Sequence, residues 1–200
     1  MPEARPTRRE ENARATRALL LATARELFGQ RGFTDVGIEE IAARAGVTTG
    51  ALYHHFGNKR GLFRAVFEAM EADLLERAIA IGSEYGDSWQ GLEAGISATL
   101  EASLAPDFQQ IALRDARTVL SAAEWRAIVD RYSFGRMRAA VEGFMGSGVI
   151  APGSPEMVAR VLISLVGELA MSIGAAEDPQ SARREAERLV RRTLAALRTE

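Results

Sequence analysis

TDVGIEEIAARAGVTTGALYHHFGNK, residues 34–59, decides the fold, because it contains two short helical patterns joined by a glycine turn. In the first pattern the apolar residues recur at offsets of 0, 3, 4 and 7 and form one stripe of a helix of about two turns, namely Ile38, Ile41, Ala42 and Ala45. Gly46 tolerates the left-handed conformation in which many helices end. We therefore expect a sharp turn there.

The second pattern begins at Thr48, a residue type that caps helix N-termini well. Leu52 and Phe56 are placed to anchor this second helix inward. Its other face shows small residues first and then flat rings with hydrogen-bonding tips, in the order Thr49, Gly50, Ala51, Tyr53, His54 and His55. Such a surface suits a DNA groove, so residues 37–56 predict a helix-turn-helix.

The run from Ala45 to Phe56, AGVTTGALYHHF, with Lys59 shortly after it, resembles the signature of the TetR family of transcriptional regulators, A-G-V-[ST]-x-G-x-L-Y-x-[HY]-F. The resemblance is specific over the N-terminal third and is one of helical layout only beyond about residue 75. It implies an all-α fold with an N-terminal three-helix DNA-binding head and a C-terminal helical domain for ligand binding and dimerisation.

The predicted DNA contacts follow from the second helix and from the resemblance. Thr49 can bond to a base or phosphate and offer its methyl group to thymine, while Gly50 and Ala51 permit close approach of the backbone. Tyr53 and His55 resemble family positions that bind phosphate, and His54 lies where relatives vary and read sequence. The full expected set is Thr48, Thr49, Gly50, Ala51, Tyr53, His54, His55 and Lys59. A packing role for the Tyr53 ring remains the alternative.

The charge of the chain is unevenly distributed. The net formal charge is -2, but residues 1–60 hold nine Arg and one Lys against seven acidic residues, which leaves the remainder at -5. The basic end is thus the end with the motif, and this modest polarity favours an approach of the head to phosphate.

Composition excludes several classes of protein. With 47% hydrophobic residues the chain can bury a core, and with no cysteine it has no disulfide, thiolate metal site or cysteine nucleophile. No apolar run approaches the roughly 18 residues that span a bilayer, and the charged start lacks the apolar core of a signal peptide. We expect a soluble, cytoplasmic protein without membrane contact.

Periodicity and capping residues predict about nine helices and no strand. Residues 1–13 read as a flexible basic arm, residues 14–75 as the DNA-binding domain and residues 84–200 as the second domain, with a polar joint between the last two. The first helix is expected at about 12–30. Later helices are expected to begin at capping residues, namely Asn58, Asp107, Ser121 with Glu124, Ser154 with Pro155, and Asp178 with Pro179. One irregularity within a helix is expected at residues 133–135.

The helix after Ser154 is apolar over more of its circumference than a surface helix. It therefore needs cover on two sides, and a second copy of the chain is the simplest second cover, as in TetR relatives, whose last two helices pair across a dimer axis. A buried helix in a monomer is the alternative. The expected interface residues are Val161, Leu165, Gly167, Leu169, Leu189, Leu194 and Leu197.

Flexible and flat apolar groups with a few charges in the second domain could line a small-molecule cavity, or equally an ordinary core. They are Phe108, Arg114, Arg117, Tyr132, Met137, Phe144, Met145, Glu168 and Met171. Adjacent residues on a helix point about 100° apart, so His54 and His55 cannot share one metal ion easily. We expect no metal, no cofactor and no catalytic site, since hydrolase, nucleotide-binding and zinc-protease motifs are missing.

These observations predict a homodimeric repressor that binds a palindromic double-stranded operator until a small-molecule ligand binds its second domain. Two alternatives remain open at this point. One is a regulator of the same fold that activates transcription or responds to no ligand, and the other is a helical interaction protein that does not bind an operator.

Overall fold

The computed structural model describes residues 7–86 and 88–199, and over these ranges the chain forms nine continuous helical segments, which confirms the predicted all-α class. Four segments lead from the head into the body: α1 (Arg8–Arg31), α2 (Ile38–Arg44), α3 (Thr49–Phe56) and α4 (Lys59–Ser83). The body continues with α5 (Trp89–Ala102). Two composite segments follow: the first consists of α6 (Pro106–Phe108), η1 (Gln109–Asp115) and α7 (Ala116–Val119), and the second of α8 (Ala122–Val129), η2 (Asp130–Phe134) and α9 (Gly135–Gly146). The chain ends with α10 (Pro155–Ala175) and α11 (Pro179–Leu197).

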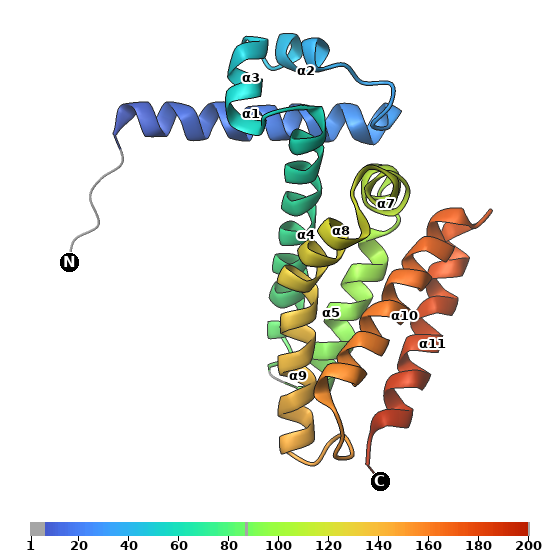
Figure 1. Ribbon diagram of the computed structural model, residues 1–200. Helices are drawn as coiled ribbons and strands as arrows, with labels where there is room; N and C mark the ends of the chain where they lie inside the picture. The colour runs from blue at the N-terminus through green and yellow to red at the C-terminus, as the bar shows by residue number, and fades with distance from the viewer. Residues whose placement is uncertain (1–6, 87, 200) are drawn as a thin grey trace.

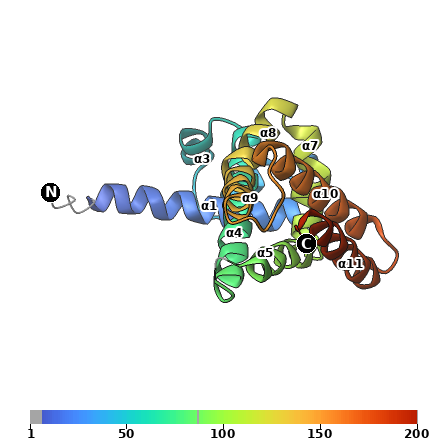
Figure 2. The same ribbon diagram turned by 90° about the horizontal axis from the view of Figure 1, so that it is seen from below.

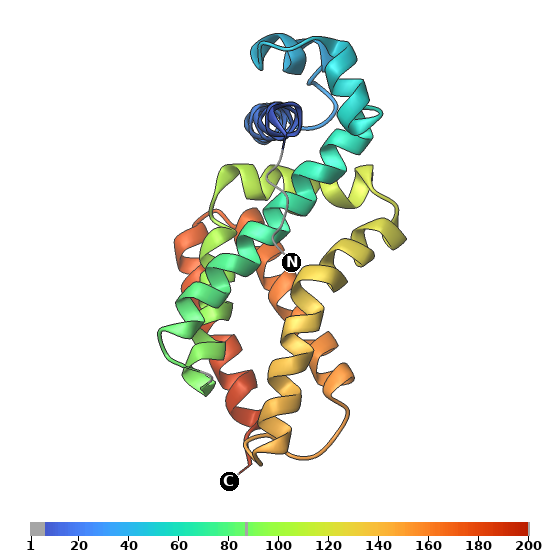
Figure 3. The ribbon, with the colours of Figure 1, turned by 90° about the vertical axis from the view of Figure 1, so that its left-hand side faces the viewer.

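The helices form two parts that share α4. In Figure 1, α1 lies across the upper end of the molecule with α2 and α3 beside it, while α4 descends from the head along the body. Figure 2 shows that the N-terminal half of α1 projects away from the body. Figure 3, which views α1 end-on, shows α4 running from the head past the other body helices.

The first helix begins earlier than the sequence analysis predicted. Thr7 caps α1, because its hydroxyl accepts from the Glu10 backbone N–H at 3.3 Å while the Glu10 carboxylate accepts from the Thr7 backbone N–H at 2.7 Å. Residues 8–13 are therefore helical, and their assignment to a flexible arm was wrong. Residues 1–6 of that predicted arm lie outside the described residues.

Most cap predictions are confirmed. Side chains of Thr48, Asn58, Ser121, Ser154 and Asp178 each accept a backbone N–H in the first turn of their helix. The prediction for Asp107 was wrong, because the helix begins with Pro106 at its first position and Asp107 instead accepts from the Arg25 side chain at 2.9 Å.

The irregularity expected at 133–135 takes the form of a π-helical turn, η2, which joins α8 to α9 without a break. A second π-helical turn, η1, lies within the 106–119 segment and was not predicted. Such turns insert one extra residue per turn and often occur at functional sites.

The buried residues form two clusters, whose boundary does not coincide with the boundary between the two predicted domains. The first combines the interior of the head with the body segment from Phe108 to Ile128, and aromatic rings of Phe28, Phe33 and Phe63 meet in it at centroid distances of 5.2 to 5.9 Å. The second lies among α5, α9, α10 and α11. The head is thus packed directly against the upper part of the body and shares a buried interior with it.

Helix α10 is the most apolar helix of the chain. It is 21 residues long with a hydropathy of 1.7 over its most apolar 18-residue window, and it is long and apolar enough to cross a membrane by those measures alone. Arg160 and Glu168 interrupt its apolar sequence, so α10 is not the uninterrupted apolar run that the sequence analysis looked for, and one such helix is weak evidence for a membrane span. Of that window 28% is buried, and Met157 and Val161 are apolar side chains of α10 that stay 64% and 59% exposed.

Candidate functional sites

The turn between α2 and α3 positions the helix that is expected to read DNA. Gly46 adopts φ of +66°, the left-handed conformation that the sequence predicted, and the backbone N–H of Val47 donates to the Ala42 carbonyl at 3.0 Å. The Thr48 hydroxyl then accepts from the Ala51 N–H at 3.2 Å and starts α3. Leu52 is fully buried and fixes α3 against the head.

The outward face of α3 carries the predicted DNA-contact residues together. Gly50 and His54 are exposed, Thr49 and Ala51 are half-buried in the first turn, and Tyr53 is 48% exposed. The ring of His55 is half-buried and lies 5.5 Å from that of His54, centroid to centroid. This surface therefore presents hydroxyl, imidazole and bare backbone groups with no acidic side chain among residues 48–56.

Lys59 lies at the first position of α4 and is partly engaged within its own chain. Its ammonium donates to the Thr34 carbonyl at 3.2 Å and sits 4.4 Å from the centroid of the Phe33 ring. Burial lowers the pKa of this ammonium from its usual value. An ammonium has three donors, so two remain for a phosphate oxygen while the third secures α4 to the head.

Further basic groups of the head lie outside the predicted set of DNA contacts, although Arg8 and Arg9 belong to the predicted basic arm. Arg8, Arg9 and Arg14 are exposed on the projecting half of α1, and the Arg17 guanidinium lies 5.4 Å from the centroid of the Phe56 ring at the end of α3. The T-x-x-E spacing of Thr7 and Glu10 was the signal that could have placed these arginines on a helix.

A cavity of about 1350 Å³ opens in the body. Helices α4, α5, α7, α8, α9 and α10 all contribute to its wall, and α4 lines it from Phe67 to Ser83. Five of the nine residues predicted for a ligand site line it: Phe108, Arg117, Met137, Phe144 and Glu168.

The other four predicted ligand residues do not line this cavity. Arg114 is exposed and donates to Gln110 at 3.4 Å, Tyr132 packs against the first core cluster, and Met145 packs against the second. Met171 is half-buried and lies outside the lining set. Helical periodicity could not distinguish these four side chains from the ones that line the cavity, because neighbouring faces of the body helices are equally apolar.

The cavity also contains polar groups that the sequence analysis did not single out. Glu71 is 7% exposed, and burial raises the pKa of its carboxyl to about 7. Among residues 7–86 and 88–199, its side-chain hydrogen-bond partner is Ser133, whose hydroxyl donates to the carboxylate at 3.5 Å. Asp130 and Arg160 form a bidentate ion pair in the wall, and the Arg160 guanidinium stacks 3.7 Å from the Phe134 centroid.

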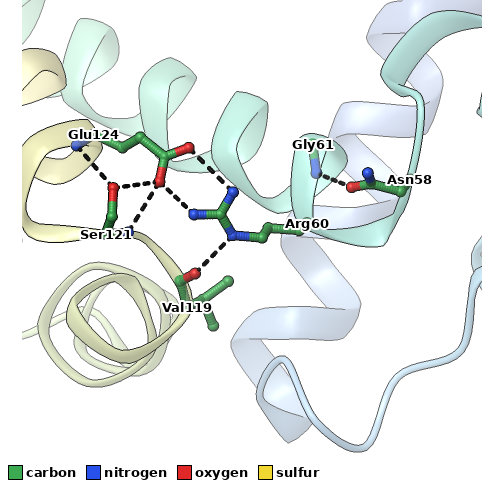
Figure 4. Close-up of polar contacts among 6 residues, drawn as sticks. All are labelled: Asn58, Arg60, Gly61, Val119, Ser121 and Glu124. Atoms are coloured by element: carbon green, nitrogen blue, oxygen red, sulfur yellow. Dashed lines mark hydrogen bonds and ion pairs between the residues drawn. The ribbon is translucent and has the colours of Figure 1, made fainter.

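A polar cluster joins the start of α4 to the junction between α7 and α8 (Figure 4). Arg60 Nε donates to the Val119 carbonyl at 3.0 Å, and its two terminal nitrogens bond to both carboxylate oxygens of Glu124. Bonds from Arg60, and then those from Ser121, lower the pKa of Glu124 to about 2. Leu120, between these partners, lines the cavity, so the cluster lies between the head and the cavity wall.

A second set of bonds ties α1 to the body. Arg25 donates to Asp73 of α4 at 2.8 Å and to Asp107 of α6 at 2.9 Å, and the Phe33 backbone N–H donates to the Asp115 carboxylate at 2.8 Å. The head is therefore held to α4, α6 and η1 at several points rather than by one linker.

The residues predicted for a dimer interface fall into four groups. Val161 and Leu189 are 59% and 43% exposed, and Leu165, Leu169 and Leu197 are half-buried. Gly167 lines the cavity. Leu194 is fully buried in the second core cluster, so its assignment to an interface was wrong; it faces the interior of its own subunit.

Within residues 7–86 and 88–199, no group of three or more His, Cys, Asp or Glu side chains is arranged to hold a metal ion. The two histidines are adjacent on α3, on its exposed side.

Two family descriptions match the chain. Residues 20–66 match the bacterial regulatory proteins of the tetR family, and residues 89–197 match the tetracyclin repressor-like C-terminal domain. The TetC protein of transposon Tn10 from Escherichia coli is 29% identical over 132 residues, 66% of each chain, and the regulator AcrR of Shigella flexneri is 33% identical over 109 residues. The matched region spans half of the AcrR chain and 54% of this one.

Solved structures extend the likeness over the whole chain. A TetR-family transcriptional regulator from Pectobacterium atrosepticum has a TM-score of 0.81 and 34% identity, covering 98% of this chain and 99% of that one. The SmeT–triclosan complex has a TM-score of 0.74 with 24% identity over 93% of each chain, which shows a shared fold. The exposed helix-turn-helix, the helical body and these matches together show that the chain belongs to the TetR family of DNA-binding transcriptional regulators.

Proposed function

We propose that this protein is a homodimeric repressor that binds a palindromic operator and is released when a small molecule occupies the cavity of the body. The observation that carries the proposal is the placement of α4. Its first residue adjoins the recognition helix α3, and its middle and end line the cavity. One rigid element therefore contacts both the DNA-reading part and the ligand site.

The DNA-reading role rests on the outward face of α3. Thr49, Gly50 and Ala51 would approach base edges, His54 would read sequence, and the hydroxyl of Tyr53 and the imidazole of His55 would bind phosphate. Thr48 would act mainly as the helix cap, with its backbone close to the DNA. Lys59 and the exposed arginines of α1 would add charge contacts to phosphates on either side.

The dimer role rests on the uncovered apolar stripe of α10 and the adjoining part of α11. Met157 and Val161 are 64% and 59% exposed, and Leu189 of α11 is 43% exposed. A second copy would cover these groups, as TetR-family regulators act as dimers. Two heads held in this way can read two half-sites in successive major grooves, about 34 to 36 Å apart or a multiple of that repeat.

Ligand release would follow from a change in the spacing of those heads. A ligand that displaces the cavity wall moves α4 and the α7–α8 junction, and Arg60 transmits the latter movement to the start of α4. The bound triclosan of SmeT, a protein of the same fold, supports a small-molecule occupant. We place this activity in the cytoplasm, where an operator is accessible.

The experiment is a DNA-binding titration of the full chain by fluorescence anisotropy, with DNA from its own upstream region. The proposal expects one specific site, bound as a dimer, and a loss of affinity when a cavity ligand is added. Binding that is equal on all sequences, or a specific complex with one monomer, would overturn it.

A further inference from the structure

The π-helical turn η1 connects the head to the helix that carries the proposed dimer surface. It contacts both α1 of the head and α10. At Gly174 of α10 the approach is so close that a Cβ atom would lie 3.3 Å from Leu113 Cδ1 and 3.4 Å from Gln109 Cγ. A packed route from α10 to the head therefore runs through η1, in addition to the route along α4.

The π-helical geometry of η1 brings two polar side chains to one face. Gln110 Nε2 donates to Asp115 Oδ1 at 3.1 Å, a bond between residues that are five apart in the chain. In an α-helix such residues point about 140° away from each other, because successive residues are about 100° apart. The i→i+5 hydrogen bonding of a π-helix places them one above the other, and the Ala116 N–H donates to the Ile111 carbonyl in this way.

Asp115 holds the backbone just after the end of α1. Its Oδ2 accepts from the Phe33 N–H at 2.8 Å, and Phe33 is the second residue after that helix. The Phe33 ring lies under the Lys59 ammonium, which donates to the neighbouring Thr34 carbonyl at 3.2 Å. Asp115 therefore holds the segment that leads from α1 to the helix-turn-helix and that supports Lys59.

A close contact one helical turn earlier supports the same docking. Gly29 of α1 faces Asp107 of α6, and a Cβ atom at Gly29 would lie 2.7 Å from the Asp107 Cβ and 3.0 Å from its Cα. A larger residue does not fit there unless α1 moves. The Asp107 carboxylate also accepts from Arg25, one turn before Gly29 on α1, at 2.9 Å. Close packing and two carboxylates thus fix α1 on residues 107–115.

We propose that Asp115 is a positioning residue for operator recognition. By holding the Phe33 backbone it fixes the orientation of the head on the body, and it thereby sets the separation of half-sites that the dimer accepts. Asp115 belongs to the body and acts through Phe33 rather than through a contact with DNA. The inference rests on the proposed function, because it requires two heads on one palindromic operator.

The separation of half-sites is a strict geometric requirement. One turn of B-form DNA contains about 10 to 10.5 base pairs, so one added base pair rotates the second half-site by about 35° and moves it by about 3.4 Å. A head that is fixed on its body cannot follow this change. A head that is held mainly by α4 can tilt toward the displaced groove.

The test measures affinity by fluorescence anisotropy for the inverted repeat that the wild type enriches from a random-sequence library, and for duplexes with one base pair added or removed between its half-sites. The wild type should lose at least about tenfold in affinity on the altered duplexes. In Asp115→Ala this penalty should shrink at least about threefold, within the net effect of one hydrogen bond. Affinity for a duplex with a single half-site should not change, since α3 is intact.

Two further variants separate a positioning role from a general loss of stability. Asp115→Asn keeps an oxygen that accepts the Phe33 N–H, so it should restore the wild-type penalty. Asp178→Ala also removes a carboxylate that accepts a backbone N–H, that of Ser181 at 3.0 Å, but this carboxylate caps α11 and does not hold the head. It should keep the wild-type penalty.

Gly29→Ala tests the docking without removal of a polar group, and it keeps the inference testable should Asp115→Ala not fold. Alanine favours a helix, so the head remains helical, but the new Cβ pushes α1 away from Asp107. The spacing penalty should therefore shrink in this variant as well.

A wild-type penalty in Asp115→Ala or in Gly29→Ala overturns the inference. So does an Asp115→Asn variant that tolerates altered spacing as far as Asp115→Ala does, or an Asp178→Ala variant that tolerates it equally. Each of these results leaves operator binding intact. A wild type that enriches no inverted repeat would refute the proposed function and this inference together, so the two failures are distinguishable.

Discussion

Arg60, in the first turn of α4, donates hydrogen bonds from two guanidinium nitrogens to the carboxylate of Glu124, in the first turn of α8, and one of these bonds is 3.1 Å long (Figure 4). The pair is partly exposed, so its contribution to folding is small, but its location is between the head and the cavity wall. The Nε of the same guanidinium donates to the Val119 carbonyl at 3.0 Å, so one side chain binds both the last residue of α7 and the first turn of α8. We interpret the pair as a mechanical connection.

Arg60→Ala should reduce the coupling between ligand and DNA. Because the start of α4 no longer follows α8, the ratio of DNA affinities without and with a cavity ligand should fall at least about threefold, within the usual effect of a mutation on an allosteric coupling free energy. Anisotropy titrations of both states measure this ratio. Arg64→Ala, which removes an exposed arginine one turn further along α4, should leave the ratio unchanged; a similar fall in both variants would contradict the connection.

The residues of α3 should separate into sequence-reading and phosphate-binding groups. Thr49→Ala combined with His54→Ala should lose discrimination between the selected DNA and a scrambled sequence, because base contacts carry specificity. Lys59→Ala should weaken both DNAs alike and reduce the slope of log affinity against log salt by about one unit. Equal losses on both DNAs from both variants would disprove this assignment of roles.

Lys59→Ala should also lower the stability of the head, an effect that sequence alone does not indicate. The ammonium donates to the Thr34 carbonyl and stacks on Phe33, so its removal leaves both groups without their partner. Thermal unfolding of the variant, measured alongside its DNA titration, separates the loss of stability from the loss of the phosphate contact.

Val161→Glu should convert the dimer into a monomer of 21.7 kDa in sedimentation velocity. The residue is 59% exposed in one subunit, on the apolar stripe of α10, so a carboxylate there would be buried without a partner in the dimer. The matched control is Ala195→Glu on an exposed position of α11, on the side of that helix away from Leu189. A dimer that persists in Val161→Glu would remove this stripe from the interface.

The free energy of unfolding should fall as pH rises from about 4.5 to about 7, because the pKa of Glu71 is raised from 4.5 to about 7 by burial. In that window the unfolded chain ionises Glu71 while the folded chain keeps it neutral, so protons bind preferentially to the folded state. The total effect is about 3 kcal/mol, and above pH 7 it stays constant.

Urea denaturation at fixed protein concentration measures this dependence, and Glu71→Gln should abolish most of it and be the more stable protein at pH 8. Glu76→Gln, at an exposed position of the same helix, should retain it. The lowered pKa of Glu124 acts only below about pH 4.5, outside this window. A wild-type profile that is flat between pH 5 and 7 would contradict the buried, unpaired state of Glu71.

The sequence predicted the parts of the fold that depend on local chemistry. The turn at Gly46 and the caps at Thr48, Asn58 and Ser121 were predictable, because a glycine conformation or a side-chain oxygen acts within three residues of its partner. The start of α1 was equally local, and the Thr7 capping box shows that its signal was present.

Features that depend on distant contacts were not predictable. Leu194 and Leu189 belong to one helix with the same chemistry, yet the first is fully buried and the second is 43% exposed, because only packing against other helices distinguishes the two faces. No local sequence signal distinguishes Glu71 from the other carboxylates of α4, because its burial depends on Ser133, 62 residues away, and on the cavity wall. Sequence periodicity predicts which face of each helix is apolar, but it does not predict which other helices pack against that face.

The central claim, that two copies read a palindromic operator, is tested most directly by selection of DNA from a random-sequence library with the full chain at moderate salt. The account predicts enrichment of one inverted repeat whose half-site centres are separated by about one helical turn or a multiple of it. Enrichment of a single unrepeated site, or of no sequence at all, would contradict it.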